Sequence, residues 1–198
     1  MVAEDLVEEW LNRRGFFTIR GAKVGNKEMH ILALRPGPGE VELWHYEVTG
    51  SLRPMSYIAP LPREVQRATG RRSKNAARRS PELVEQGVAE WVQNKYNDES
   101  LQELRNNLCR GRWQFAFVYA KAVHGDEELP LIERARIQVI KLAKIIDHLR
   151  QASRMEESKL SGAAGSDLSD LVMWEHLVGP LRDSAGSRPP HRHSPIGG

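Results

Sequence analysis

The sequence contains a single cysteine, Cys109, among its 198 residues. One cysteine excludes a disulfide within the chain, and no Cys-x-x-Cys pair is present to hold a structural zinc ion. We interpret Cys109 as a small buried apolar residue, which is the usual environment of an unpaired cysteine.

Long apolar runs are missing as well, since no stretch approaches the roughly 20 residues that a membrane-spanning helix needs. The residues after Met1 run Val-Ala-Glu-Asp-Leu-Val-Glu-Glu, which is acidic where a signal peptide would be basic. We therefore expect a soluble protein of the reducing cytoplasm that has no membrane partner.

Acidic residues are scarce between residues 63 and 79, where Glu64 is the only one. We call residues 63–79 the basic segment; its cations are Arg63, Arg67, Arg71, Arg72, Lys74, Arg78 and Arg79. The overall net charge of +3 is too small to indicate a partner. A local concentration of positive charge, however, favours contact with the phosphates of a nucleic acid. The alternative is an ordinary solvated face, on which a spacing of three or four would align several of these cations along one helix.

Apolar residues recur at helical spacing near the N-terminus and at strand spacing after it. A Pro-Gly-Pro-Gly cluster at 36–39 predicts a hairpin loop, and Ser80 with Pro81 predicts a helix start. The predicted helices cover 3–13, 81–96, a shorter stretch after residue 98, 126–136 and 144–151; the predicted strands cover 16–19, 29–34, 41–48, 113–120 and 137–142. This order predicts an α/β fold with a mixed central β-sheet flanked by helices.

Residues 50–80 hold no sustained apolar period, so we expect them to leave the core and to become helical from about Arg63. The folded domain is predicted to span 1–152. Beyond it we expect a flexible linker at 153–166, an amphipathic helix at 167–182 and a disordered tail at 183–198.

Four pieces of the first fifty residues carry a resemblance to a known superfamily. They are Ala3-Glu4-Asp5-Leu6, Gly15-Phe16, Glu28-Met29-His30-Ile31-Leu32-Ala33 and Tyr46-Glu47-Val48-Thr49. In this order they resemble the Holliday-junction-resolvase and RecB-nuclease branch of the PD-(D/E)XK, restriction-endonuclease-like superfamily. That branch has Ala-Glu in the first helix, Gly-Glu-Ile-Asp-Leu-Ile-Ala on the second strand and Glu-Val-Lys on the third. The later helices and strands agree with the αβββαβ core of that superfamily.

The resemblance implies a metal-dependent DNA endonuclease, which hydrolyses phosphodiester bonds with Mg²⁺ or Mn²⁺. In the family a strand aspartate and a strand glutamate bind the metal, and a lysine two residues after the glutamate positions the attacking water. Glu47 matches the strand glutamate, Glu4 the helix glutamate, and Glu28 the acid two residues before the aspartate. His30 stands in place of the aspartate and Thr49 in place of the lysine. The resemblance thus implies catalytic roles for Glu4, Glu28, Glu47 and Thr49, with Glu47 and His30 as metal ligands.

The two departures leave two functions open. An imidazole at position 30 can ligate Mn²⁺, Fe²⁺ or Zn²⁺, but it removes a negative charge on which Mg²⁺ binding relies. Thr49 can hydrogen-bond a water, but it supplies no positive charge. The chain is either a metal-dependent DNA endonuclease or a catalytically inactive nuclease-fold module that binds DNA or a protein.

Three further features have simpler interpretations. His45 lies two residues before Glu47 and shares its strand face, and we favour a structural role for it over one near the site. His191 and His193 are assigned no function. The predicted helix around Leu168 to Leu181 packs on the core, mediates self-association or docks a partner, so a homodimer is also open.

Overall fold

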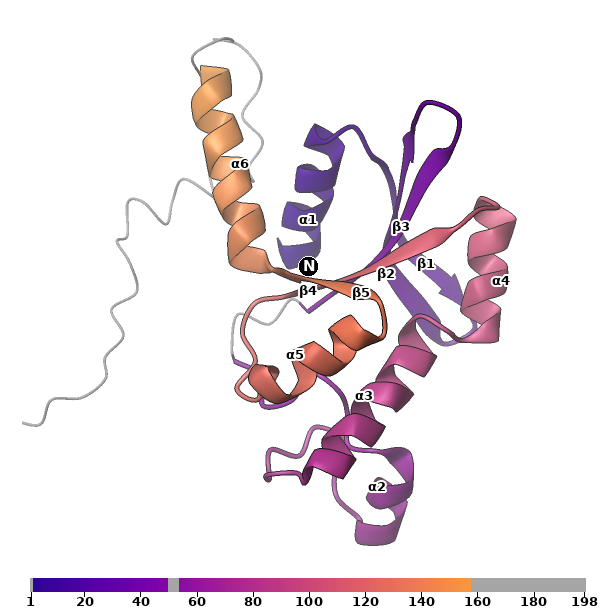
Figure 1. The fold of residues 1–198 in the computed structure, drawn as a ribbon, viewed down its shortest axis with the longest axis vertical. Coiled ribbons are helices and arrows are strands. Elements are labelled where there is room, and N and C mark those ends of the chain that lie inside the picture. The colour runs from indigo at the N-terminus through magenta and orange to yellow at the C-terminus, as the bar shows by residue number, and fades with distance from the viewer. Residues whose placement is uncertain (1, 50–53, 158–198) are drawn as a thin grey trace, which may run out of the picture.

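The structure is a computed structural model that describes residues 2–49 and 54–157 of the chain. Its centre is a five-stranded sheet in the order β1-β2-β3-β4-β5 (Figure 1). The strands are β1 (Phe17–Val24), β2 (Lys27–Pro36), β3 (Val41–Val48), β4 (Trp113–Tyr119) and β5 (Ile137–Lys141). The first three strands form an antiparallel meander, whereas β4 runs parallel to β3 and β5 runs parallel to β4. The predicted mixed sheet is confirmed.

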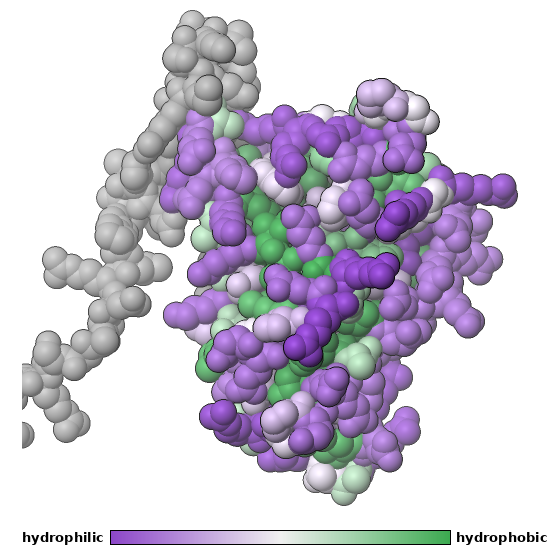
Figure 2. All heavy atoms as spheres, viewed as in Figure 1, coloured by the Kyte–Doolittle hydropathy of each residue, from purple (hydrophilic) through white to green (hydrophobic). Residues whose placement is uncertain are grey.

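Helices cover both faces of this sheet, which confirms the predicted α/β class. They are α1 (Val2–Arg13), α2 (Arg63–Thr69), α3 (Pro81–Lys95), α4 (Glu99–Leu108), α5 (Gly125–Arg134) and α6 (Leu142–Glu157). Helices α1 and α6 pack on one face through a shared apolar cluster, and α3 and α5 pack on the other. A smaller cluster joins α4 to β2. Hydrophilic side chains cover most of the face seen in Figure 2, with apolar residues showing between them.

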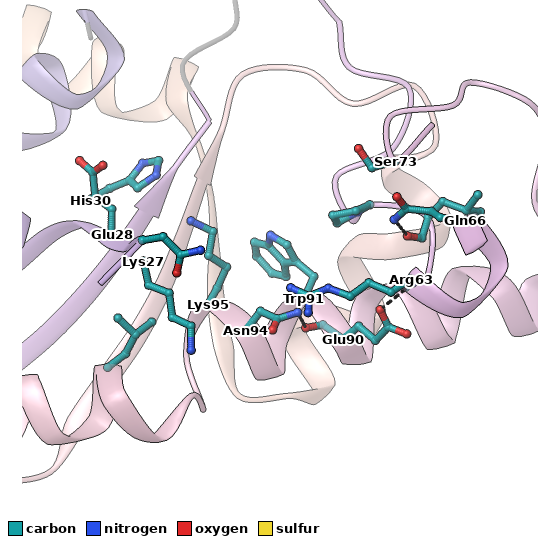
Figure 3. Close-up of a pocket in the computed structure, with 15 residues that line it drawn as sticks. Lys27, Glu28, His30, Arg63, Gln66, Ser73, Glu90, Trp91, Asn94 and Lys95 are labelled. Carbon is teal, nitrogen blue, oxygen red and sulfur yellow. Dashed lines mark hydrogen bonds between the residues drawn. The ribbon is translucent and has the colours of Figure 1, made fainter. Parts of the chain in front are cut away.

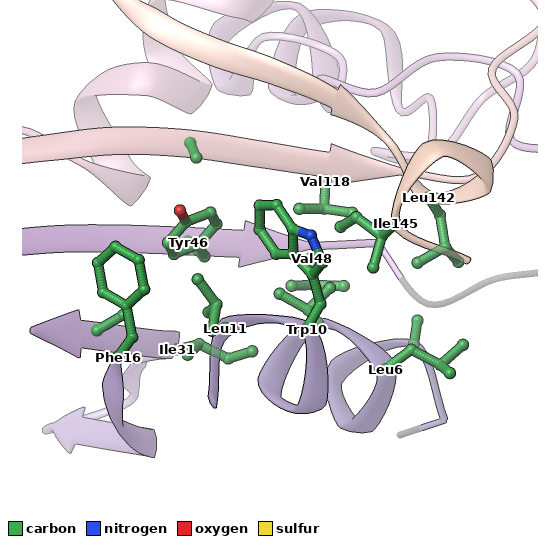
Figure 4. Packing of buried hydrophobic residues seen from close by; sticks show 14 of the residues in the cluster. Leu6, Trp10, Leu11, Phe16, Ile31, Tyr46, Val48, Val118, Leu142 and Ile145 are labelled. Atoms are coloured by element: carbon green, nitrogen blue, oxygen red, sulfur yellow. The ribbon is translucent and has the colours of Figure 1, made fainter. Parts of the chain in front are cut away.

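The larger cluster fixes α1 and α6 against the strands, as Figure 4 shows. Leu11 and Ile145, one from each helix, are fully buried in it together with Ile31 of β2. These residues occupy the apolar positions of amphipathic helices and the inward positions of a strand, which is why the periodicity of the sequence located them.

Several elements differ from the predicted ranges. Strand β1 runs eight residues instead of four, because a two-residue turn at Gly25 and Asn26 lets it pair with β2 up to Val24 and Lys27. Gly25 has a φ of 59°, which such turns require. Helix α6 continues to Glu157, so its last five residues lie in the stretch predicted as linker. Cys109 is partly exposed where burial was expected.

The remaining predicted segments, from residue 158 to the C-terminus, lie outside the described residues. This includes the predicted helix at 167–182 and the predicted tail. None of the helices in the described part of the chain is long and apolar enough to cross a membrane.

Residues 54–62, here called the β3–α2 connection, are held against α3 and α5. The Glu128 carboxylate in α5 accepts hydrogen bonds from the backbone N–H groups of Ile58 (2.6 Å) and Ala59 (2.8 Å). Gly87 in α3 faces the same connection, and a Cβ at this position would lie 2.9 Å from the carbonyl oxygen of Pro60. The connection therefore has a fixed position beside α3, and it determines where the basic segment begins.

Replacing Ile145 with alanine tests the packing of α6. The side chain is fully buried between α6 and α1, so we expect the free energy of unfolding to fall by about 2–5 kcal/mol in chemical denaturation. Val123→Ala is the matched control, because Val123 is 59% exposed and its truncation is expected to change stability by at most about 0.5 kcal/mol. Equal midpoints for both variants would show that α6 does not close this core.

Candidate functional site

Glu47 is a buried carboxylate near the end of β3, with 2% of its surface exposed. Strand alternation sends His45 and Glu47 toward α3 and α4, whereas Tyr46 and Val48 face α1 and α6. A buried carboxylate is costly unless charged or hydrogen-bonding groups surround it. The groups that do so come from four other elements of the fold.

Lys95 supplies the nearest positive charge to Glu47. Its ammonium nitrogen lies 2.6 Å from Glu47 Oε2, and it reaches the strand from the last residue of α3. The Lys95 side chain is about one-third exposed, so it links the buried carboxylate to the surface. A lysine in this place supplies the positive charge that the residue after the strand, Thr49, lacks.

Arg105 and His45 hold the other carboxylate oxygen. Arg105 Nη1 lies 3.1 Å from His45 Nδ1, and His45 Nε2 lies 3.1 Å from Glu47 Oε1. A guanidinium can only donate, so Nδ1 accepts and the ring proton sits on Nε2, from which it is donated to Glu47. Burial lowers the pKa of His45, which keeps the ring neutral in this relay. Arg105 itself is anchored by the carbonyl oxygen of Tyr96, 2.6 Å from Nη2.

His30 joins Glu47 to Glu4 of α1. His30 Nε2 lies 3.5 Å from Glu47 Oε2, and His30 Nδ1 lies 3.1 Å from Glu4 Oε1. The backbone N–H of Val48 also lies 3.3 Å from Nδ1. Opposite His30, Gly21 of β1 has a φ of 61°, and the strands pair at the positions on either side but not at this one. The interruption places His30 where it reaches residues of both α1 and β3.

We call these six side chains the ion cluster: Glu4, His30, His45, Glu47, Lys95 and Arg105. Burial by itself raises the pKa of Glu47, but the hydrogen bond from His45 and the positive charges around it have the larger combined effect. The pKa of Glu47 is therefore lowered, and the carboxylate is ionised at neutral pH. The cluster is a compensated buried charge rather than a neutral carboxyl group.

The ion cluster does not fit a divalent metal ion as it is arranged. Both oxygens of Glu47 and both nitrogens of His30 have protein partners, and the Lys95 ammonium lies against the oxygen that would bind a metal. No group of three or more His, Cys, Asp or Glu residues suited to holding a metal occurs in the described part of the chain. An aspartate at position 30 would leave room for a cation, whereas the imidazole fills the space between the two carboxylates.

The structure brings together Glu4, His30 and Glu47 of the residues that the resemblance singled out, but not Thr49 and Glu28. The Thr49 hydroxyl donates to the carbonyl oxygen of Val118 (3.3 Å), which makes it part of the β3–β4 pairing. Glu28 pairs with Lys23 across the β1–β2 hairpin at 3.1 Å, and its side chain is about half exposed. Catalytic roles for these two residues have no geometric support.

The basic segment is helical only over α2, because Gly70 ends the helix with a φ of 67°. The expected stripe of cations along one helix therefore does not form. Arg79 is a second correction: it is buried, its guanidinium stacks 4.0 Å over the Tyr57 ring, and Nη1 donates to the carbonyl oxygen of Ala59 at 2.9 Å. It holds the β3–α2 connection instead of facing a nucleic acid. The other six cations of the segment are exposed: Arg63, Arg67, Arg71, Arg72, Lys74 and Arg78.

A groove of about 610 Å³ runs from the ion cluster to the basic segment. In Figure 3, His30 and Lys95 lie at one end, and Arg63 and Gln66 of α2 lie at the other. Its remaining lining comes mainly from β2 and α3 and mixes polar side chains with apolar ones such as Leu61, Trp91 and Leu101. Acidic side chains in the groove already have partners: Glu28 pairs with Lys23, and Glu90 accepts a hydrogen bond from the backbone N–H of Arg63 (3.1 Å).

Lys95 and Arg105 were not identified from the sequence. Each is one basic residue in an amphipathic helix, and the sequence holds no signal that either would turn toward Glu47. His45 was placed on the correct strand face, and its contact with Glu47 is consistent with the favoured structural role.

Comparisons with known protein families, with curated proteins and with solved structures find no match for this chain.

Glu47→Gln tests whether the buried charge is part of folding stability. A carboxyl whose pKa is lowered on folding stabilises the folded state above its unfolded pKa, here about 4.5, and this stabilisation is lost as pH falls through the folded value. We expect the wild type to lose unfolding free energy from about pH 4.5 downward more steeply than Glu47→Gln in urea titrations at several pH values.

Glu40→Gln is the control for net charge, because it removes an exposed carboxylate from the β2–β3 hairpin. Parallel pH profiles for the wild type and Glu47→Gln would contradict an ionised Glu47 in the folded state.

Proposed function

We propose that the protein binds nucleic acid along the groove between the ion cluster and the basic segment. The observation that carries this proposal is the placement of the basic segment. Six of its cations are exposed, one of them, Arg63 of α2, lines one end of the groove, and Lys95 lines the other end. A polyanion lying in the groove would meet positive charge at both ends, and phosphate contacts of this kind supply most of the affinity for nucleic acid.

The elements around the groove support a nuclease-type architecture for this module. An α-β-β-β core precedes the α3-to-β4 unit, as in the αβββαβ order of the PD-(D/E)XK superfamily that the sequence resembles. Glu4, His30 and Glu47 occupy the positions matched to that superfamily. The His30 ring lies within contact distance of both carboxylates. DNA is the nucleic acid on which the superfamily acts, so DNA is the substrate class we propose.

Binding without metal-dependent cleavage is the function that the ion cluster favours. The Lys95 ammonium neutralises Glu47, and the His30 imidazole fills the space where a catalytic cation would lie. Metal-dependent hydrolysis is the second candidate, and one observation favours it. Lys95 supplies an ammonium group beside the strand glutamate, so the absence of a lysine at position 49 does not by itself remove that charge.

Charge neutralisation in the basic segment tests the proposed binding. Replacing Arg71, Arg72 and Lys74 with glutamine removes three exposed cations. We expect the plot of log affinity against log salt for duplex DNA to become shallower by about 2–3 units, because each phosphate contact contributes a slope of about 0.9. The loss should be similar for unrelated sequences, since backbone contacts do not read bases. Fluorescence anisotropy over a salt series measures both quantities.

The matched control replaces Arg110, Arg112 and Lys141 with glutamine. These three cations are exposed and lie outside the groove and the basic segment. Replacing them changes the net charge by the same amount as the first triple variant. Equal changes in slope for the two triple variants would show that net charge alone causes the effect. That result would contradict specific phosphate binding in the groove.

His30→Asp separates binding from hydrolysis. The wild type is expected to show no heat of Mg²⁺ binding in calorimetry and no Mg²⁺-dependent cleavage, because the donors around Glu47 have protein partners. An aspartate at position 30 restores a second strand carboxylate, so we expect Mg²⁺ binding to appear in this variant and to disappear when Glu47→Ala is added. Binding of Mg²⁺ or Mn²⁺ with DNA cleavage by the wild type would establish the second candidate function instead.

A further inference from the structure

A second cavity lies on the other side of the sheet from the groove, between α1, β3, β5 and α6. Its volume is about 240 Å³. Strand β3 separates the two sites: Glu47 faces the groove, while Trp44 and Tyr46 line this cavity from the opposite face of the same strand. The cavity has no contact with the ion cluster, so nothing in the proposed function accounts for it.

The walls of the cavity are aromatic. Trp10 and Phe16 from the N-terminal part of the chain meet Trp44 and Tyr46 from β3. Trp10 and Tyr46 pack edge to face with centroids 6.4 Å apart, and Trp44 and Tyr46 lie 5.6 Å apart at an angle of 30°. Aromatic walls of this kind favour a planar ring, which can stack on one side chain and meet the edge of another.

The hydroxyl group of Tyr46, a residue that lines the cavity, has no hydrogen-bond partner among the described residues. Tyr46 is 3% exposed, and its hydroxyl makes no hydrogen bond within the described residues. The hydroxyl oxygen is nevertheless not fully enclosed by protein atoms. The hydroxyl therefore opens into the cavity. Burial raises the pKa of Tyr46, so the phenol stays neutral and is available as a hydrogen-bond donor. A ligand acceptor can therefore take a hydrogen bond from this hydroxyl without breaking one within the protein.

Positive charge surrounds the mouth of the cavity. Arg14 and Lys144 line it and are exposed, and the Arg14 guanidinium lies 4.4 Å over the Trp10 ring. Glu42 is the one acid in the lining, and its carboxylate is already engaged by Arg35 (2.6 Å) and by the Trp44 indole N–H (2.7 Å). The cavity thus combines an aromatic interior with an entrance suited to an anion.

We propose that this cavity binds the base of a nucleotide, with the phosphate held at the entrance by Arg14 and Lys144. A volume below the roughly 300–1,000 Å³ of typical small-molecule sites limits the occupant to one small ring system. Stacking on the partly exposed ring of Trp44, a hydrogen bond from Tyr46 and two cations for the phosphate are the contacts that a base with an attached phosphate requires. The nucleotide is either free or the unpaired end of a strand, and the proposal stands independently of the groove.

Titration of the full chain with AMP, adenosine and inorganic phosphate tests this site, with tryptophan fluorescence and calorimetry as readouts. AMP is expected to bind saturably, and adenosine and phosphate alone about tenfold or more weaker. Tyr46→Phe removes only the hydroxyl and Lys144→Gln only the charge, and each is expected to weaken AMP binding about 3–10-fold. Lys141→Gln is the control, because Lys141 is exposed nearby but does not line the cavity.

A 5′-phosphorylated trinucleotide separates the two sources of the nucleotide, measured in the Arg71, Arg72 and Lys74 glutamine variant so that the groove contributes little. Binding of AMP but not of the trinucleotide indicates a free nucleotide as the ligand, and tighter binding of the trinucleotide indicates a strand end. Absence of saturable binding for both would overturn the proposal. So would equal affinities of the wild type, Tyr46→Phe and Lys144→Gln for AMP.

Discussion

The buried charge of Glu47 is the constraint on which the arrangement of this fold depends. A carboxylate at 2% exposure is tolerated only because Lys95, His45 and His30 surround it, and Arg105 holds His45 in the required orientation. These partners come from two helices and two strands, and Glu4 of a third helix, α1, contacts His30. The end of α3, the last turn of α4, the pairing of β2 with β3 and the position of α1 must all be correct before the charge is compensated.

The same requirement determines what this part of the molecule can do. In the superfamily that the sequence resembles, a metal ion neutralises the converging carboxylates and activates water. Here an imidazole and an ammonium group occupy that space, so positive charge is supplied by the chain itself. Lys95 lines the groove opposite the basic segment, which supports the proposed binding of a phosphate backbone without hydrolysis.

The fold was predictable from the sequence because it depends on local patterns. The helical and strand periods located most of the elements, and the Pro-Gly-Pro-Gly cluster marked the β2–β3 hairpin. The resemblance placed Glu4, His30 and Glu47 together. Lys95 and Arg105 were not predictable, because their roles arise only when α3 and α4 pack beside β3. In the sequence, a basic residue of an amphipathic helix that contacts Glu47 cannot be distinguished from one that faces solvent. The prediction that Arg79 contacts nucleic acid failed for a related reason. A cation in a basic run was expected at the surface, but Tyr57 and Ala59 bury it.

Mapping backbone amide chemical shifts during titration with a short DNA duplex tests most directly where nucleic acid binds. The largest changes are expected along the groove, at residues 63–74 of the basic segment and at Asn94 and Lys95 in the last turn of α3. Residues of α5, which line neither the groove nor the cavity beside β5, should change little. Changes concentrated on α5, or none at all with saturating duplex, would contradict a nucleic-acid groove on this face of the sheet.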